Sequence, residues 1–61
     1  MNKLKTDILR QLRQSGSRPV SGERLAEQFS VTRAAVWKSI AALKRDGYRI
    51  EGVPRAGYRL L

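Results

Sequence analysis

Residues 32–47, Thr-Arg-Ala-Ala-Val-Trp-Lys-Ser-Ile-Ala-Ala-Leu-Lys-Arg-Asp-Gly, decide how this sequence folds. Within them Val36, Ile40 and Leu43 recur at the spacing of one helix face and fall within about 60° of one another on a helical wheel. The stretch opens on threonine, a good N-cap, and closes on glycine, a residue that commonly ends helices. We therefore predict a helix over residues 33–46, held to the core by its aliphatic side.

The opposite side of this helix is small and basic, with Ala34, Lys38, Ala41 and Arg45 flanked by Ala35 and Ala42. Methyl-sized side chains let a helix backbone approach base edges, while lysine and arginine reach phosphates or guanine acceptors. The first turn, with Thr32, Arg33 and Ala34, would enter a DNA groove most deeply. The structural alternative is that the alanines are good helix formers and the charges are simply solvated.

Two more helices are predicted upstream. Residues 3–14 carry a stripe at helical spacing that ends near Gly16, formed by Leu4, Ile8, Leu9 and Leu12. Val20 is expected to be a short extended connector, and Ser21 is a good N-cap for a helix that runs to about Phe29. Because so short a turn separates this helix from residues 33–46, the two should cross steeply as a helix-turn-helix.

The remaining residues change from helical spacing to alternation. Tyr48 and Ile50, and later Tyr58 and Leu60, alternate with charged residues as in two half-buried strands, and residues 53–57 supply the turn. A β-hairpin after a helix-turn-helix is a wing. We predict an α+β fold, a winged helix-turn-helix with three helices followed by a two-stranded hairpin, as one domain over residues 1–61.

Composition favours a nucleic-acid partner. Thirteen Lys and Arg against five Asp and Glu give a net charge of +8, which attracts polyanions. No apolar run approaches the roughly 20 residues that span a bilayer, so we expect no membrane partner, and no signal segment precedes the first helix. The lack of cysteine fits a cytoplasmic location.

We expect no enzyme activity from these residues. The sequence has neither His nor Cys, and its five carboxylates are scattered, so catalytic, cofactor and metal residues are all predicted to be absent. No small-molecule site is expected in this domain.

Nine residues are predicted to contact DNA: Ser21, Thr32, Arg33, Ala34, Ala35, Trp37, Lys38, Arg45 and Arg55. Trp37 lies about 100° from the core direction on the wheel; it either packs against the wing or the first helix, the simpler expectation, or contacts a sugar or thymine methyl. Arg55, in the wing tip around residues 54–57, either enters the minor groove, meets a phosphate, or stays solvated.

Residues 32–40, followed by Leu43, Gly47 and the stretch 53–60 (Val-Pro-Arg-Ala-Gly-Tyr-Arg-Leu), resemble the N-terminal domain of the biotin protein ligase/biotin operon repressor family. The likeness covers about residues 4–61. It implies a winged helix that binds the biotin operator and that precedes a catalytic part, of which no counterpart is present here. It also implies a homodimer formed through parts missing from this chain.

Two departures and two alternatives accompany this resemblance. The family often has glycine at the inter-helix turn where this chain has Ser30, and a left-handed backbone there would cost Ser30 about 1 kcal/mol. Trp37 stands where some relatives carry a polar residue. The alternative functions are a protein-interaction module and an RNA-binding module with the same fold, unrelated to a biotin operon.

Overall fold

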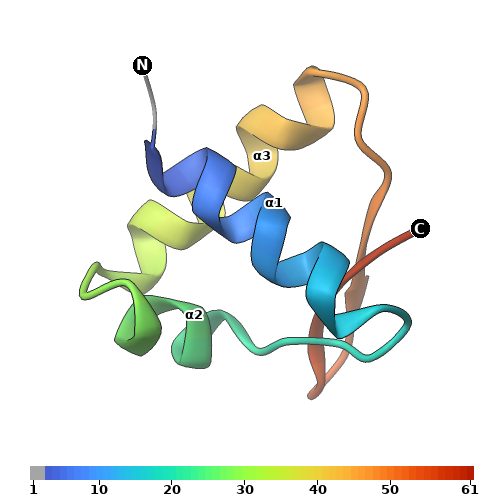
Figure 1. Cartoon of the computed structure of the whole chain (residues 1–61). Helices are drawn as coiled ribbons and strands as arrows, with labels where there is room; N and C mark the ends of the chain where they lie inside the picture. The colour runs from blue at the N-terminus through green and yellow to red at the C-terminus, as the bar shows by residue number, and fades with distance from the viewer. Residues whose placement is uncertain (1–2) are drawn as a thin grey trace.

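Three helices precede a small antiparallel sheet in the computed structural model, which describes residues 3–61. The elements are α1 (Lys3–Ser15), α2 (Gly22–Gln28), α3 (Arg33–Arg45), β1 (Ile50–Val53) and β2 (Gly57–Leu60). The helices cross one another, and the hairpin lies beside them near the end of α1 (Figure 1). The predicted α+β winged helix-turn-helix is confirmed.

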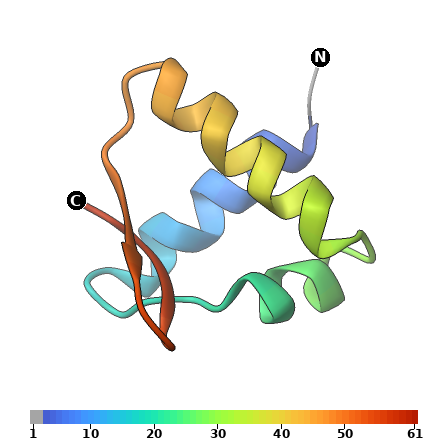
Figure 2. The same cartoon turned by 180° about the vertical axis from the view of Figure 1, so that it is seen from behind.

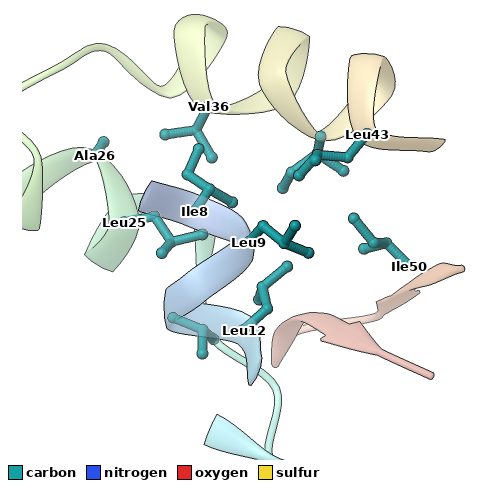
Figure 3. Packing of buried hydrophobic residues seen from close by; sticks show 10 residues of the cluster. Ile8, Leu9, Leu12, Leu25, Ala26, Val36, Leu43 and Ile50 are labelled. Carbon is teal, nitrogen blue, oxygen red and sulfur yellow. The ribbon is translucent and has the colours of Figure 1, made fainter. Parts of the chain in front are cut away.

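One apolar core joins all three helices to the sheet (Figure 3). Its fully buried members are Ile8 and Leu12 of α1, Leu25 of α2, and Val36, Ile40 and Leu43 of α3, and Ile50 of β1 covers them at 7% exposure. These are the positions that helical spacing assigned to the interior. With neither a disulfide nor His or Cys for a zinc site in the sequence, burial of this apolar surface stabilises the fold.

Both predicted N-caps of the helix-turn-helix are observed. The Ser21 hydroxyl accepts a hydrogen bond from the Arg24 backbone N–H, and the Thr32 hydroxyl accepts one from the Ala35 N–H, each at 3.0 Å. Each cap satisfies a backbone donor that has no partner within its helix. The starts of α2 and α3 are therefore fixed locally by sequence.

The turn between α2 and α3 has a strained residue at its centre. Ser30 has φ +54°. Its N–H donates to Glu27 O at 3.3 Å, and the Val31 N–H donates to Ala26 O at 2.9 Å, which together form a Schellman motif. This motif places its left-handed residue at position 30, so serine occupies a backbone conformation that favours glycine.

Replacing Ser30 by glycine is expected to stabilise the domain by about 0.5–1 kcal/mol. Glycine removes the free-energy cost of placing a Cβ in the left-handed region. Its larger conformational entropy in the unfolded state lowers stability by a smaller amount. Chemical denaturation should show a higher midpoint at an unchanged slope. Ser30→Ala is the matched control, because alanine keeps a Cβ in the left-handed region. Equal denaturation midpoints for the Ser30→Gly and Ser30→Ala variants would show that the backbone at position 30 is not strained.

The wing has the predicted inward phase but begins later and gains a third partner. Ile50 pairs with Leu60 and Gly52 with Tyr58, so these positions share a face, whereas Tyr48 precedes β1. Val20, expected to be only a connector, exchanges two backbone hydrogen bonds of 2.8 Å with Tyr58. The segment between α1 and α2 therefore fastens the hairpin to the helices.

Candidate nucleic-acid interface

The outward side of α3 is open to solvent, as its sequence predicted. Ala34, Lys38 and Arg45 are exposed, and the alanines that flank them are half-buried. Figure 2 shows α3 in front, with α1 behind it and the hairpin to one side. At 1.5 Å per residue the stripe from Ala34 to Arg45 is about 16 Å long, and α-helices of ordinary width fit the major groove. Neither the core nor the hairpin covers it.

A cleft joins the first turn of α3 to the hairpin; we call it the wing cleft. It is lined by Ser21, Gly22 and Glu23 at the start of α2, by Arg33, Ala34, Val36 and Trp37 of α3, and by residues 52–58 of the hairpin. Segments far apart in the sequence thus form one concave surface. Its lining contains two arginines, Arg33 and Arg55, and a single carboxylate, Glu23, so the cleft favours an anionic ligand.

The tip of the wing is a tight turn that projects Arg55. The Ala56 N–H donates to Val53 O at 3.0 Å, Pro54 occupies the second position of the turn, and Arg55 has φ +65°. A type II turn requires positive φ at that third position, where glycine or asparagine is usual. Arg55 is exposed. The wing therefore places a cationic side chain, in a strained backbone, at the rim of the cleft.

Gly57 holds this wing against the start of α2. It has φ +127°, and a Cβ built on it would lie 2.2 Å from Val20 O and 2.6 Å from Ser21 Cα. Only hydrogen at this position lets the hairpin backbone approach so closely. Together with the Val20–Tyr58 bridge, this contact sets the distance between the wing and the N-cap of α2.

Trp37 departs from the simpler expectation that it packs against the wing or the first helix. The residue is 62% exposed, and it lines the wing cleft one turn after Arg33 and Ala34. An aromatic side chain buries large area on contact, so leaving most of it in water is unfavourable without a partner. Trp37 is thus a large apolar surface within an otherwise small and basic interface.

The predicted contact residues fall into two groups. One group lines the wing cleft: Ser21, Arg33, Ala34, Trp37 and Arg55. The other lies outside it and consists of the α3 N-cap Thr32 and of Ala35, Lys38 and Arg45 on α3. Thr32 and Ser21 also act as caps. On the hairpin, Arg59 forms an ion pair with the facing Glu51, which holds its charge on the strand surface rather than at the cleft.

Sequence reasoning placed residues 54–57 in the wing tip, but it missed the part that Val20 plays in building the cleft. Pro54 and Ala56 line it, and Val20 and Gly57 position its two walls. The only signal for the Val20 contact was a β-branched residue after Pro19, which no periodicity linked to the distant wing.

No helix within residues 3–61 is long and apolar enough to cross a membrane. Among the same residues, no group of three or more Asp or Glu side chains is arranged to hold a metal ion.

The sequence is similar to known helix-turn-helix proteins. A family model described as "HTH domain" matches residues 5–59. The chain is 40% identical over 58 residues to the bifunctional ligase/repressor BirA of Bacillus spizizenii and 38% identical over 58 residues to BirA of Bacillus subtilis. Each alignment covers 95% of this chain and 18% of the relative. It is 36% identical over 58 residues to the transcriptional repressor CcpN of Bacillus subtilis, covering 26% of that protein.

The chain therefore spans 18–26% of the length of these curated relatives, and the predicted resemblance to the ligase/repressor family is confirmed. Because the family model covers nearly all the described residues and the fold has the expected helices and wing, this chain belongs to the HTH domain family, in its winged form.

Proposed function

We propose that this chain is the sequence-specific, duplex-DNA-binding module of a transcriptional repressor. The observation that carries the proposal is the continuity of the exposed, small and basic side of α3 with a wing cleft that is rimmed by Arg33 and Arg55. A groove-filling helix beside a cationic hairpin suits a double helix, because the helix can read base edges while the hairpin contacts the adjoining backbone or minor groove.

The role of each side chain follows from its size and charge. Ala34 and Ala35 let the first turn of α3 approach base edges and thymine methyls, while Arg33 and Lys38 donate to guanine acceptors or phosphates. Arg45 lies about 16 Å from Ala34 along the helix axis, and it meets the phosphate backbone at the far edge of the groove. Arg55 meets a phosphate or enters the minor groove from the wing. Phosphate contacts position the domain, and base contacts select the sequence.

The parent function is proposed from the relatives. Two of them are bifunctional ligase/repressor proteins, and the third is a transcriptional repressor. The resemblance to the biotin ligase/repressor family implies a biotin operator as the target and a homodimer formed outside residues 1–61. A dimer reading two half-sites about one helical turn apart would supply the specific affinity that one module lacks.

Titration with duplex DNA tests the proposal directly. Trp37 is the only tryptophan of the sequence, so its fluorescence reports on the wing cleft itself. We expect a saturable fluorescence change with mixed-sequence duplex DNA. About four to six phosphate contacts would give a slope near −4 to −5 in a plot of log affinity against log salt. Selection from a randomised duplex pool should then enrich a defined motif.

Competition separates the alternatives. Hairpin RNA of equal charge, added at the same salt, should displace the duplex poorly, because the deep and narrow major groove of A-form RNA does not admit a helix. A chain that bound RNA as tightly, or that showed no salt-dependent binding to duplex DNA, would contradict the proposal. A winged-helix module for protein contacts would show the second result.

A further inference from the structure

A second hollow adjoins the wing tip at Ala56, and no residue of α3 lines it. Its lining includes Gln11 of α1, Arg18 and Ser21 of the connector, Arg24 and Gln28 of α2, and Ala56 of the hairpin. The end of α1, the connector and the hairpin lie close together in both views (Figures 1 and 2). Ser21 and Ala56 line this hollow and the wing cleft alike, so the two surfaces meet at a common ridge.

The charge of this hollow has one sign. Arg18 and Arg24 line it, and none of its lining residues is a carboxylate. Among residues 3–61 neither guanidinium forms an ion pair, whereas Lys5 of α1 is paired with Asp46 and Arg13 lies over the Tyr48 ring at 5.9 Å. The two arginines are therefore the cations of this edge that the fold leaves available to a ligand.

Two hydrogen bonds hold parts of the lining of this hollow in place. The Gln28 side-chain amide donates to the Gln11 side-chain oxygen at 2.9 Å, which links α2 to α1. The Arg24 backbone N–H is fixed by the Ser21 cap. A polar lining with two arginine side chains suits phosphate oxygens, which accept hydrogen bonds from guanidinium groups.

We propose that the second hollow binds the phosphodiester backbone of DNA that continues past the wing tip, with Arg18 and Arg24 as its phosphate ligands. The inference rests on the proposed function, because the DNA is positioned by α3 and the wing. The domain measures 26 × 24 × 18 Å, so a duplex lying along its longest dimension is in reach over about eight base pairs. DNA crossing the ridge of Ser21 and Ala56 passes from one concave surface directly to the other.

These contacts add affinity without adding sequence information. Arginines on a phosphate backbone fix the position of the duplex, and they act alike on every sequence. The edge of the domain beyond the wing would thus lengthen the footprint outside the bases read by α3.

Replacing both arginines tests this inference on the intact chain. Arg18→Gln/Arg24→Gln is compared with Lys3→Gln/Arg10→Gln, which removes the same charge from exposed positions of α1 that line neither hollow. The probe is a mixed-sequence duplex of about 30 base pairs, longer than the expected footprint, and the readout is Trp37 fluorescence. Thermal melts of both variants verify folding.

Losing two phosphate contacts should make the salt slope shallower by about 1.8 and weaken binding by about tenfold near 0.1 M salt, while the control pair changes both by less than half as much. If the two double variants change the salt slope and the affinity equally, the arginines contribute only to the overall charge of the domain. That result would overturn the inference. An unchanged slope for Arg18→Gln/Arg24→Gln would do the same. If the unsubstituted chain fails to bind duplex DNA, both the proposed function and this inference are wrong. If it binds and only the arginine substitutions have no specific effect, this inference alone is wrong.

Discussion

Gly57→Ala is expected to destabilise the domain by at least about 3 kcal/mol, more than any other single methyl group that could be added to its glycines. The new Cβ would stand 2.2 Å from Val20 O and 2.4 Å from Val20 C, in a residue whose φ is +127°. Both neighbours are backbone atoms, and Val20 is held by two hydrogen bonds of 2.8 Å to Tyr58. Relief requires the loss of that bridge, so clash and backbone strain add.

Gly52→Ala is the matched control in the same hairpin. Its added Cβ meets nothing within 4 Å, and its φ is not positive, so we expect a change within about 0.5 kcal/mol. Urea denaturation followed by circular dichroism compares the two variants. The amide of Tyr58, which donates to Val20 O, should lose its protection from hydrogen exchange in Gly57→Ala alone. Similar midpoints for the two variants would show that the wing is not fastened through this contact.

The elements that local sequence determines were predicted from it. The caps at Ser21 and Thr32, the buried stripe of α3 and the end of α1 beside Gly16 each depend on residues within a few positions of one another. The Val20–Tyr58 bridge joins residues separated by two helices and β1. Because Val20 is a single paired residue, it has no alternation from which a strand could be inferred. The third partner of the wing therefore had to be found in the structure.

The candidate site likewise has one part that the sequence predicted and one part that it did not. The exposed side of α3 followed from a helical wheel, since burial of one face fixes which residues face outward. The wing cleft did not, because its depth depends on how closely the hairpin approaches the start of α2. The exposure of Trp37 at 62% has the same origin. Its angle on the helix made it a boundary residue, and only the placement of the wing decided how much of the ring would be covered.

Ala34→Glu is expected to weaken duplex binding by more than 100-fold without lowering stability. Ala34 is exposed, lies in the first turn of α3 and lines the wing cleft. A carboxylate there faces the electronegative groove and its phosphates, and it fills space that a methyl group leaves for base edges. The same carboxylate near the N-terminus of α3 interacts favourably with the helix dipole, worth up to about 0.5 kcal/mol. Binding and folding should thus change in opposite directions.

Two comparisons isolate the cause of that loss. Thr6→Glu adds the same charge to the exposed first turn of α1, so it should reproduce only the small effect of lower net charge. Ala34→Gln adds nearly the same volume without the charge, and its binding should fall between those of the parent and the glutamate variant. Trp37 fluorescence titration measures all three, with melts as the folding check. If Ala34→Glu binds as Thr6→Glu does, the wing cleft does not face DNA, because no orientation of a groove-bound α3 first turn tolerates a buried carboxylate.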